Sequence, residues 1–365
     1  MLRFADVFSG PGGLSLGFVL AGWKPVWAIE KGTWPFRTYS YNFVRLFPHL
    51  IAIQKDVSSL KMKDITDLPK GLEAVIGGPP CKPFSSANRR RMRLSHEDYN
   101  LPRRFIKLSI KLKPSLILME EVPGFKRFME KMLLKRLKNA GFHAKVVYLD
   151  ASEFGVPQRR RRHFLLALND KSELLNEILE RLFCLRSSSS ISVGQAICDL
   201  PEKAYYGKEE EPLSYRSSPV NPYQEWARTS FGGSSKVTNH VTSKAKRMAE
   251  KFPYIRPGEN LKKAFSRLPA EIKRTFKNRS AIHSNIYRRL DPRKPSITVT
   301  HPRKAVIIHP FKDRIITVRE AARLQGFPDA FKFIGPLNAM QQMVADAVPP
   351  KLAEAIAKAI AGVLK

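Results

Sequence analysis

Short apolar runs that alternate with helical patterns constrain the fold of this chain more than any other feature of its sequence. The runs predict strands at residues 2–8, 26–29, 51–53, 72–76, 116–119, 146–149 and 163–168. Amphipathic patterns at 14–20 and 103–112 predict helices between them. Strands and helices in this alternation are typical of an α/β fold with a doubly wound, mostly parallel sheet that is covered on both faces.

Polar or reactive residues follow four of the expected strands. Glu30, Asp56, Cys81 and Glu120 each stand at or just beyond the carboxyl end of a strand. Because ligands of open parallel sheets bind beyond these ends, the pattern predicts a ligand site at this edge of the sheet.

A glycine-rich turn, Gly10-Pro11-Gly12-Gly13, connects the first expected strand to the first helix. Such a turn is either only a turn or a place where the backbone approaches a ligand closely. Ser15 occupies the position of the third glycine of the dinucleotide fingerprint, which disfavours a nicotinamide-dependent oxidoreductase. Glu30 lies twenty residues after Gly10, at a spacing suited to holding ribose hydroxyls.

Cys81 follows two prolines at the end of a strand, so a rigid turn presents its thiol to a cleft. Residues 81–100 contain five Lys or Arg and two Asp or Glu, and nearby cations favour a thiolate and contact with phosphates. We expect this segment to be a basic lid over nucleic acid. Cys184 and Cys198 are expected to be small buried residues, and the spacing of the three cysteines argues against a disulfide framework and against a zinc site.

Carboxylates and arginines near two later strands leave alternatives open. Glu120 and Glu121 are either a solvated strand end or, in an apolar cleft, the place of a protonated carboxyl group that donates a proton. The run from Gln158 to His163 is either a solvated basic turn or a segment whose arginines point in alternate directions, some of them into the cleft.

The charge of the chain indicates its partner. Sixty-four Lys and Arg face thirty-two Asp and Glu, a formal net charge of +32. Heat adaptation raises both signs of charge and does not explain this excess, whereas a phosphate backbone does. No apolar run approaches the roughly 18 residues of a membrane span, and Asp6 comes too early for a signal peptide. We therefore expect a soluble cytoplasmic protein, associated with the nucleoid if prokaryotic, that binds nucleic acid and no membrane.

The composition and the periodicity of the sequence change near residue 184. A serine run at 187–190 opens about a hundred residues that are rich in Pro, Tyr, Lys and Arg and weakly periodic. Regularity returns near 315–318 and in an apolar-faced helix at 350–364. We expect three parts: a regular domain at 1–183, a smaller irregular domain at 184–312, and a segment at 313–365 that returns to the first domain.

Together these segments resemble the cytosine C5 methyltransferases, a family that uses S-adenosyl-L-methionine. The matching motifs stand in the family's order: Asp6–Gly13, Gly78–Ser85, Glu120–Gly124, Gln158–Arg162, Arg288–Leu290 with Lys294–Thr298, Val318–Pro328 and Ala345–Pro350. They extend from residue 4 to about 360 and leave out roughly 185–285.

The resemblance implies a class I methyltransferase fold and a methyl transfer to C5 of cytosine in a specific sequence of duplex DNA. In this family Cys81 would attack C6 of a flipped base, which Glu120, Arg160 and Arg162 would surround. The residues implied to border S-adenosyl-L-methionine are Phe8, Gly10, Gly12, Gly13, Leu14, Glu30, Asp56, Val57, Pro80, Asp346 and Val348. No metal site is implied. The segment 184–312 would recognise the target, and a monomer with a cognate restriction endonuclease is expected.

Two departures and two alternatives accompany this resemblance. Glu121 stands where the family usually has Asn, and Ala345-Asp346 stands where it has Gly-Asn. Asp346 would lie near the methionine end of the cofactor, whose ammonium tolerates an acid. The alternatives are a tRNA cytosine-5 methyltransferase and a catalytically inactive DNA-binding relative. The variable region lacks the Cys-Phe-Thr motif of the tRNA branch, which favours DNA.

Within the variable region, base-edge contacts would come from side chains that donate and accept hydrogen bonds. The candidate readers are Tyr205, Tyr206, Lys236, Asn239, His240, Arg247 and Lys251, and the alternative for each is an ordinary surface residue.

Overall fold

The computed structural model describes residues 1–60, 63–80, 100–121, 129–169, 172–276 and 286–364. The chain forms two compact units. Unit 1 contains Met1–Phe154, Arg161–Ser187 and Ala347–Lys365, and unit 2 contains Gly155–Arg160 and Ser188–Asp346. Cys81 lies outside the described residues.

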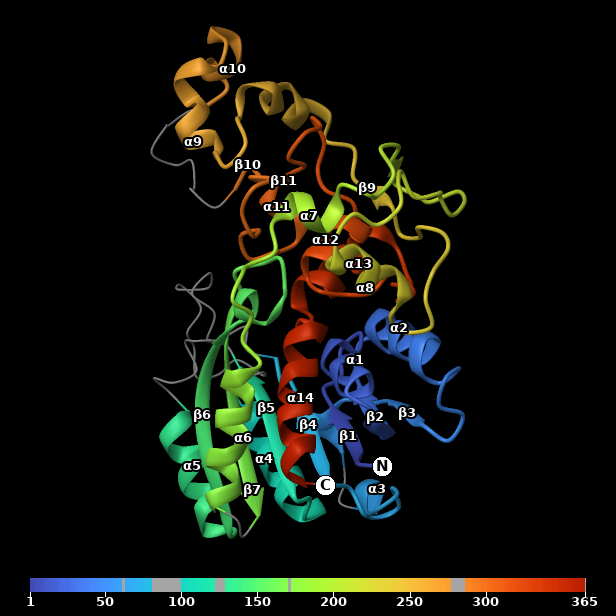
Figure 1. The fold of residues 1–365 in the computed structure, drawn as a ribbon, viewed down its shortest axis with the longest axis vertical. Coiled ribbons are helices and arrows are strands. Elements are labelled where there is room, and N and C mark those ends of the chain that lie inside the picture. Colours follow the sequence, from blue (N-terminus) through green and yellow to red (C-terminus); the bar gives the residue numbers. More distant parts are fainter. Residues whose placement is uncertain (61–62, 81–99, 122–128, 170–171, 277–285, 365) are drawn as a thin grey trace. The chain divides into compact units, whose positions relative to one another are not determined.

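Unit 1 is built on a seven-stranded sheet with the order β3-β2-β1-β4-β5-β7-β6 (Figure 1). The strands are β1 Arg3–Val7, β2 Lys24–Glu30, β3 Ile51–Gln54, β4 Ala74–Gly77, β5 Leu116–Glu121, β6 Phe142–Asp150 and β7 Arg161–Asn169. β1 to β5 pair in parallel, while β7 runs antiparallel to both β5 and β6. The expected α/β fold with a mainly parallel sheet is confirmed.

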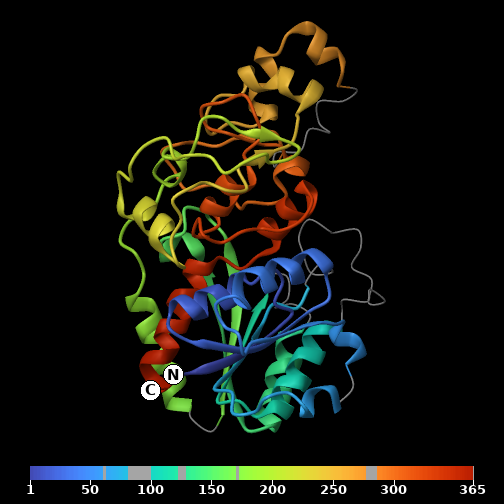
Figure 2. The ribbon, with the colours of Figure 1, turned by 90° about the vertical axis from the view of Figure 1, so that its right-hand side faces the viewer.

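Helices cover both faces of this sheet. They are α1 Gly13–Leu20, α2 Thr33–Phe43, α3 Lys63–Thr66, α4 Leu101–Leu112, α5 Glu130–Asn139, α6 Ser172–Cys184 and α14 Pro350–Leu364. Alternate side chains of β1 lie on opposite faces of the sheet. Ala5 and Val7 join the core under α4 and α5. Phe4 packs on the other face, where its ring centroid lies 5.3 Å from that of Phe18 in α1. Figure 2 shows α6 and α14 on the side of the sheet opposite α4 and α5.

The C-terminal helix is an integral part of unit 1. An added Cβ at Gly17 of α1 would lie 2.3 Å from Cβ of Ala353, so only glycine lets α14 approach this closely. The indole Nε1 of Trp23 donates to the carbonyl of Ala357 at 3.2 Å. The helix expected at 350–364 is confirmed, and its packing explains why one of its faces is apolar.

Unit 2 consists of short elements joined by long connections, as the weak periodicity of its sequence indicates. Its helices are α7 Val193–Ile197, α8 Pro222–Thr229, α9 Leu261–Ala264, α10 Ala270–Arg274, α11 Pro302–Ala305, α12 Val318–Leu324 and α13 Leu337–Asp346. Its strands are β8 Tyr205–Tyr206, β9 Val241–Thr242, β10 Arg288–Arg289 and β11 Ile307–Ile308. The short helical segments η7 Lys246–Tyr254 and η8 Phe265–Arg267 complete it.

Buried arginines hold these short elements together. Arg323 of α12 is fully buried and donates to Asp329 at 2.6 and 2.7 Å and to Asp199 at 3.2 Å. Arg319, one turn earlier, donates to the carbonyl oxygens of Thr238 and Phe331 at 3.0 and 2.7 Å. Guanidinium groups therefore satisfy main-chain acceptors that regular strands would otherwise satisfy.

The expected burial of two cysteines is wrong. Cys184 and Cys198 are both exposed. Cys184 ends α6, whose buried face carries Leu175, Ile178 and Leu182, and a residue two positions after Leu182 falls on the opposite face. Cys198 caps the end of α7, beyond the buried residues Ala196 and Ile197.

No helix in the described part of the chain combines the length and the apolar composition needed to cross a membrane.

Candidate active site

The turn after β1 depends on unusual backbone angles. Phe8, Gly10 and Gly12 have φ of +66°, +56° and +103°. The amides of Phe8 and Ser9 both donate to the carbonyl of Ile29, at 3.0 and 3.1 Å, which joins the turn to β2. A Cβ at Gly12 would lie 2.3 Å from Phe43, whereas one at Gly10 would have no atom within 4 Å. The turn is thus tightly packed at Gly12, where α1 begins with Gly13 and Leu14, and open beside Gly10.

Glu30, the last residue of β2, connects this turn to the next one. Its Oε2 accepts a hydrogen bond from the Gly10 amide at 2.9 Å, and its Oε1 accepts one from the Gly32 amide at 2.6 Å. Burial raises the pKa of Glu30, and these hydrogen bonds work in the opposite direction. The carboxyl group is therefore fixed at the carboxyl edge of the sheet, directly beside the glycine turn.

Asp56 and Val57 follow β3 at the same edge. Asp56 accepts a hydrogen bond from the Ser58 amide at 2.8 Å and forms an ion pair with Lys31 at 2.8 Å. Burial alone would raise its pKa, but the interactions with Lys31 and Ser58 outweigh that effect and lower the pKa of Asp56 to about 2. Val57 is buried in the core that also contains Trp27 and Ile29. Glu30 and Asp56 thus offer two carboxylates next to neighbouring strands.

A buried polar cluster that no sequence motif indicates lies beneath the glycine turn. Asp6 of β1 is fully buried, and its Oδ2 accepts a hydrogen bond from Oγ of Ser15 at 2.6 Å. Oγ of Ser15 also lies 3.1 Å from the hydroxyl of Tyr39. Burial raises the pKa of Asp6 to about 7. Ser15 thus joins β1 to α1 and α2. In the sequence it stands out only because it occupies the position of the third glycine of the dinucleotide fingerprint.

Glu120 and Arg162 form an ion pair at the end of β5. Oε1 of Glu120 lies 2.9 Å from Nε of Arg162, and both side chains are mostly buried. The antiparallel register places Glu120 opposite Phe164, so Arg162 is its diagonal neighbour on the same face. A Cβ at Gly78 would lie 3.6 Å from Oε2 of Glu120, so this second oxygen faces the turn that leads through Pro80 to Cys81.

Neither glutamate at this strand end is solvated. Glu120 is 7% exposed and Glu121 is 1% exposed. Glu121 points to the other face, where the register pairs it with the buried His163. The interpretation of this pair as a solvated strand end is therefore wrong.

The four arginines at 159–162 alternate between exposed and buried positions, as expected where the chain enters a strand. Arg159 and Arg161 are exposed, whereas Arg160 is buried and Arg162 is mostly buried. Within unit 2, Arg160 donates to the carbonyl oxygens of Val299 and Ala345 at 3.4 and 3.0 Å. Asp346, also in unit 2, is exposed and accepts hydrogen bonds from Gln342 at 2.9 and 3.0 Å. Val348 belongs to unit 1 and is buried.

Three candidate base readers of unit 2 are buried. Asn239 accepts a hydrogen bond from the Phe333 amide at 2.8 Å and donates to the carbonyl of the same residue at 3.1 Å. A ring nitrogen of His240 lies 3.0 Å from the carbonyl of Pro201, and Tyr205 is 5% exposed. These side chains support the fold of unit 2. Tyr206, Lys236 and Arg247 are exposed.

Comparisons with known proteins place the chain in a single family. The sequence pattern of the C-5 cytosine-specific DNA methylases matches residues 2–362. The Type II methyltransferase M.DdeI of Desulfomicrobium norvegicum is 33% identical, over 98% of this chain and 88% of that protein. The Type II methyltransferase M1.HphI of Haemophilus parahaemolyticus is 29% identical, over 98% of this chain and 86% of its own length.

Solved structures give the same picture of the fold. An E. coli prophage protein described as a DNA modification methyltransferase superposes with a TM-score of 0.77 and 25% identity, covering 100% of this chain and 99% of that one. The S. pombe Dnmt2 methyltransferase superposes with a TM-score of 0.62 at 16% identity, covering 100% of both chains, and shows the likeness of the fold alone.

Proposed function

The chain belongs to the C-5 cytosine-specific DNA methylase family, and from this premise we propose that it transfers a methyl group from S-adenosyl-L-methionine to C5 of cytosine in a specific sequence of duplex DNA. The observation that carries the proposal is the ion pair of Glu120 with Arg162 through Oε1 of the glutamate, whose other oxygen, Oε2, faces Gly78 in the turn before Cys81. This pair provides a fixed carboxyl group for the ring of a pyrimidine.

The carboxyl edge of unit 1 fits the cofactor. The space beside Gly10 lets a ligand approach the main chain, and Glu30 stands next to it with a carboxylate suited to ribose hydroxyls. We assign Phe8, Gly12, Gly13, Leu14, Asp56, Val57, Pro80, Asp346 and Val348 to the same role. When bound, S-adenosyl-L-methionine supplies an electrophilic methyl group on a sulfonium.

The protein's task is to make C5 of cytosine nucleophilic. The target base must leave the stack, since a paired base is out of reach. The thiolate of Cys81 then adds to C6, a sulfur–carbon bond forms, and the electrons of the C5–C6 double bond become available at C5. Glu120 acts at N3: because Arg162 holds Oε1, Oε2 is the oxygen that carries the proton toward the ring.

The reaction ends by elimination. After C5 has gained the methyl group, a base removes the proton from C5, the C5–C6 double bond re-forms, and the thiolate of Cys81 leaves with the electrons of the sulfur–carbon bond. N3 returns its proton to Glu120. Arg160 and Arg162 are assigned to the surroundings of the cytosine, with Arg162 acting through Glu120.

The roles that we propose for the parts of the chain follow the three parts expected from the sequence. We propose that residues 1–183 with the final segment perform catalysis and bind the cofactor, and that residues 184–312 recognise the target. Relatives named as Type II methyltransferases support a modification enzyme that acts beside a cognate restriction endonuclease. We further propose that the enzyme is a monomer.

The decisive experiment offers equal amounts of duplex DNA and tRNA to the purified protein with labelled S-adenosyl-L-methionine. We expect label in DNA, and bisulfite sequencing of a plasmid from expressing cells then gives the methylated sequence. Label mainly in tRNA would overturn the DNA assignment while leaving cytosine C5 chemistry in place. Binding of DNA without transfer to either substrate would indicate an inactive relative.

A further inference from the structure

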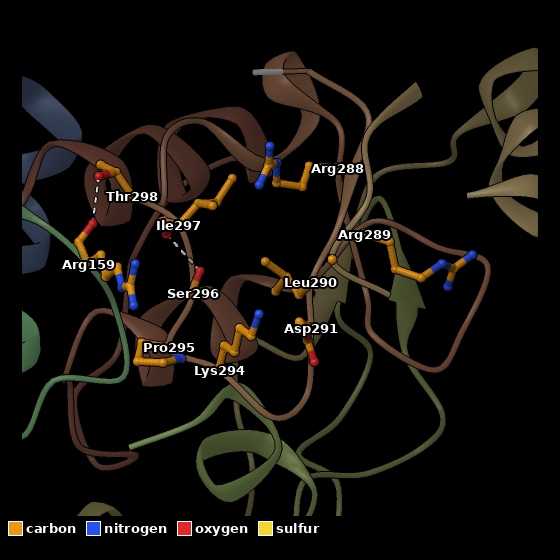
Figure 3. A pocket seen from close by; sticks show the side chains of 11 residues that line it. Arg159, Arg288, Arg289, Leu290, Asp291, Lys294, Pro295, Ser296, Ile297 and Thr298 are labelled. Atoms are coloured by element: carbon orange, nitrogen blue, oxygen red, sulfur yellow. Dashed lines mark hydrogen bonds between the residues drawn. The ribbon is translucent and has the colours of Figure 1, made fainter. Parts of the chain in front are cut away.

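Unit 2 contains a pocket lined largely by the motif Arg288–Leu290 with Lys294–Thr298, to which the proposed reaction gives no role. Its volume is about 400 Å³, which is within the range of ligand sites. Its walls come from Arg159, Gly258 and the two segments 288–291 and 294–298 (Figure 3).

Three cations surround the opening of this pocket. Figure 3 shows the side chains of Arg159, Arg288 and Lys294 reaching it from three different parts of unit 2. Among the described residues, none of these three side chains makes a hydrogen bond or an ion pair. Arg288 is half-buried, so its guanidinium is partly removed from water without a protein acceptor in exchange.

The acid in the pocket wall does not compensate for these charges. Asp291 accepts hydrogen bonds from the main-chain N and from Nε of Arg293, at 3.0 and 3.2 Å. Its carboxylate is thus engaged by an arginine outside the pocket, although Lys294 also lowers the pKa of Asp291.

Arg289, the neighbour of Arg288 in β10, has a different role. Its side chain points away from the opening in Figure 3 and is 5% exposed. It donates to the carbonyl oxygens of Phe252, Ile255 and His309, at 2.7, 2.6 and 3.0 Å. Consecutive residues of a strand face opposite sides, so Arg289 supports the wall while Arg288 is directed to the pocket.

Hydrogen bonds to the main chain hold the part of the pocket wall that contains Arg159. The Arg159 amide donates to the carbonyl of Ser296 at 2.9 Å, and the Ser296 amide donates to that of Pro157 at 2.9 Å. Oγ1 of Thr298 donates to the carbonyl of Arg159 at 2.8 Å. These hydrogen bonds fix the main chain from which the Arg159 side chain extends to the pocket.

The positive charges of Arg159, Arg288 and Lys294 indicate that the ligand of this pocket is an anion. The edge of a base is neutral, whereas each phosphodiester of DNA carries a negative charge and accepts hydrogen bonds from arginine and lysine, which are its usual partners. We propose that this pocket binds a phosphate group of the DNA backbone through Arg159, Arg288 and Lys294. The inference rests on the proposed function and adds a contact that fixes the DNA strand on unit 2.

The test measures the affinity of the full-length protein for a fluorescent duplex at salt concentrations from 50 to 200 mM. We expect Arg288→Gln and Lys294→Gln to weaken binding to duplexes of every sequence. Each should lower the slope of log K against log salt by about 0.9, so that the loss of affinity over this range shrinks by about 3.5-fold per contact. Arg288→Lys should keep most of the slope, and Lys208→Gln, which removes an exposed cation of unit 2 outside the pocket, should leave it unchanged.

Three results would overturn the proposal. An unchanged slope for Arg288→Gln together with a changed methylated sequence would make Arg288 a base reader. Unchanged slope and sequence would exclude a DNA contact. Calorimetric binding of inorganic phosphate that Arg288→Gln abolishes, without an effect on the DNA slope, would indicate a site for a free anion.

Circular dichroism confirms that each variant is folded. Because the slope is a property of binding, it is read independently of methyl transfer. Wild-type protein that binds duplex DNA with the expected slope but methylates none would therefore contradict the proposed function and leave the pocket assignment intact.

Discussion

Arg162 and Glu120 form an ion pair across two neighbouring strands, with Nε of the arginine 2.9 Å from Oε1 of the glutamate. Arg161, the preceding residue of β7, is exposed and pairs with Asp150 at the surface. The two adjacent arginines of β7 thus have different roles. Arg162 orients a buried carboxyl group, whereas Arg161 contributes charge at the surface.

We expect Arg162→Ala to lower kcat for methyl transfer by about a hundredfold, since a misplaced general acid loses most of its effect. KM for DNA should change little, because Arg162 acts through Glu120. Arg161→Ala is the matched control and should retain near-normal kcat, since exposed ion pairs contribute little. Steady-state kinetics of both variants, with a pH profile of kcat for Arg162→Ala, check this. Equal losses in the two variants would remove the positioning role of Arg162.

The cysteines give a second prediction. Cys81→Ala should abolish methyl transfer and leave DNA binding nearly intact, because affinity comes mainly from phosphate contacts. Cys184→Ser and Cys198→Ser replace exposed residues and should keep full activity and a stability within about 0.5 kcal/mol of wild type. Labelled methyl transfer and gel shifts, measured on the same preparations, distinguish these outcomes. Turnover at the wild-type rate in Cys81→Ala would exclude the covalent pathway.

The regular half of the fold could be predicted because its strands are continuous apolar runs. β1 to β5 lie within a few residues of their expected positions, and the alternate burial of Arg159 to Arg162 follows from the period of a strand. The average burial of cysteine does not predict the exposure of Cys184, which follows from its position on the face of α6 opposite Leu182.

Long-range polar contacts explain most of what the sequence did not predict. Asp6 and Ser15 are nine residues apart and Ser15 and Tyr39 are 24 residues apart, and the three meet only when β1, α1 and α2 pack together. In unit 2, Asn239 was a candidate base reader because of its residue type, yet its amide group is bound to the main chain of Phe333. No local pattern shows which polar side chains a tertiary fold will bury.

The arginine network of unit 2 yields a third prediction. Arg323→Met removes the partner of two buried carboxylates, Asp329 and Asp199, and breaking such a network costs about 3–5 kcal/mol. We expect a clearly lower midpoint in urea denaturation. Arg303→Met changes an exposed arginine of α11 in the same unit and should shift the midpoint little. A destabilisation of the same size in both variants would mean that the charge itself, and not its buried contacts, matters.

The last prediction concerns pH and Asp6. Burial raises the pKa of this carboxyl group to about 7, so the folded chain holds a proton that the unfolded chain, with an ordinary pKa near 3.8, releases. The stabilising contribution is therefore complete below about pH 4 and is lost as pH rises to about 7, on the order of 4 kcal/mol in total. We expect Asp6→Asn, which cannot titrate, to flatten the pH dependence of the free energy of unfolding between pH 5 and 7.5. Urea denaturation at several pH values measures this slope, and Asp67→Asn, at an exposed carboxylate, should keep the wild-type slope. If Asp6→Asn kept it as well, Asp6 would not be the titrating group.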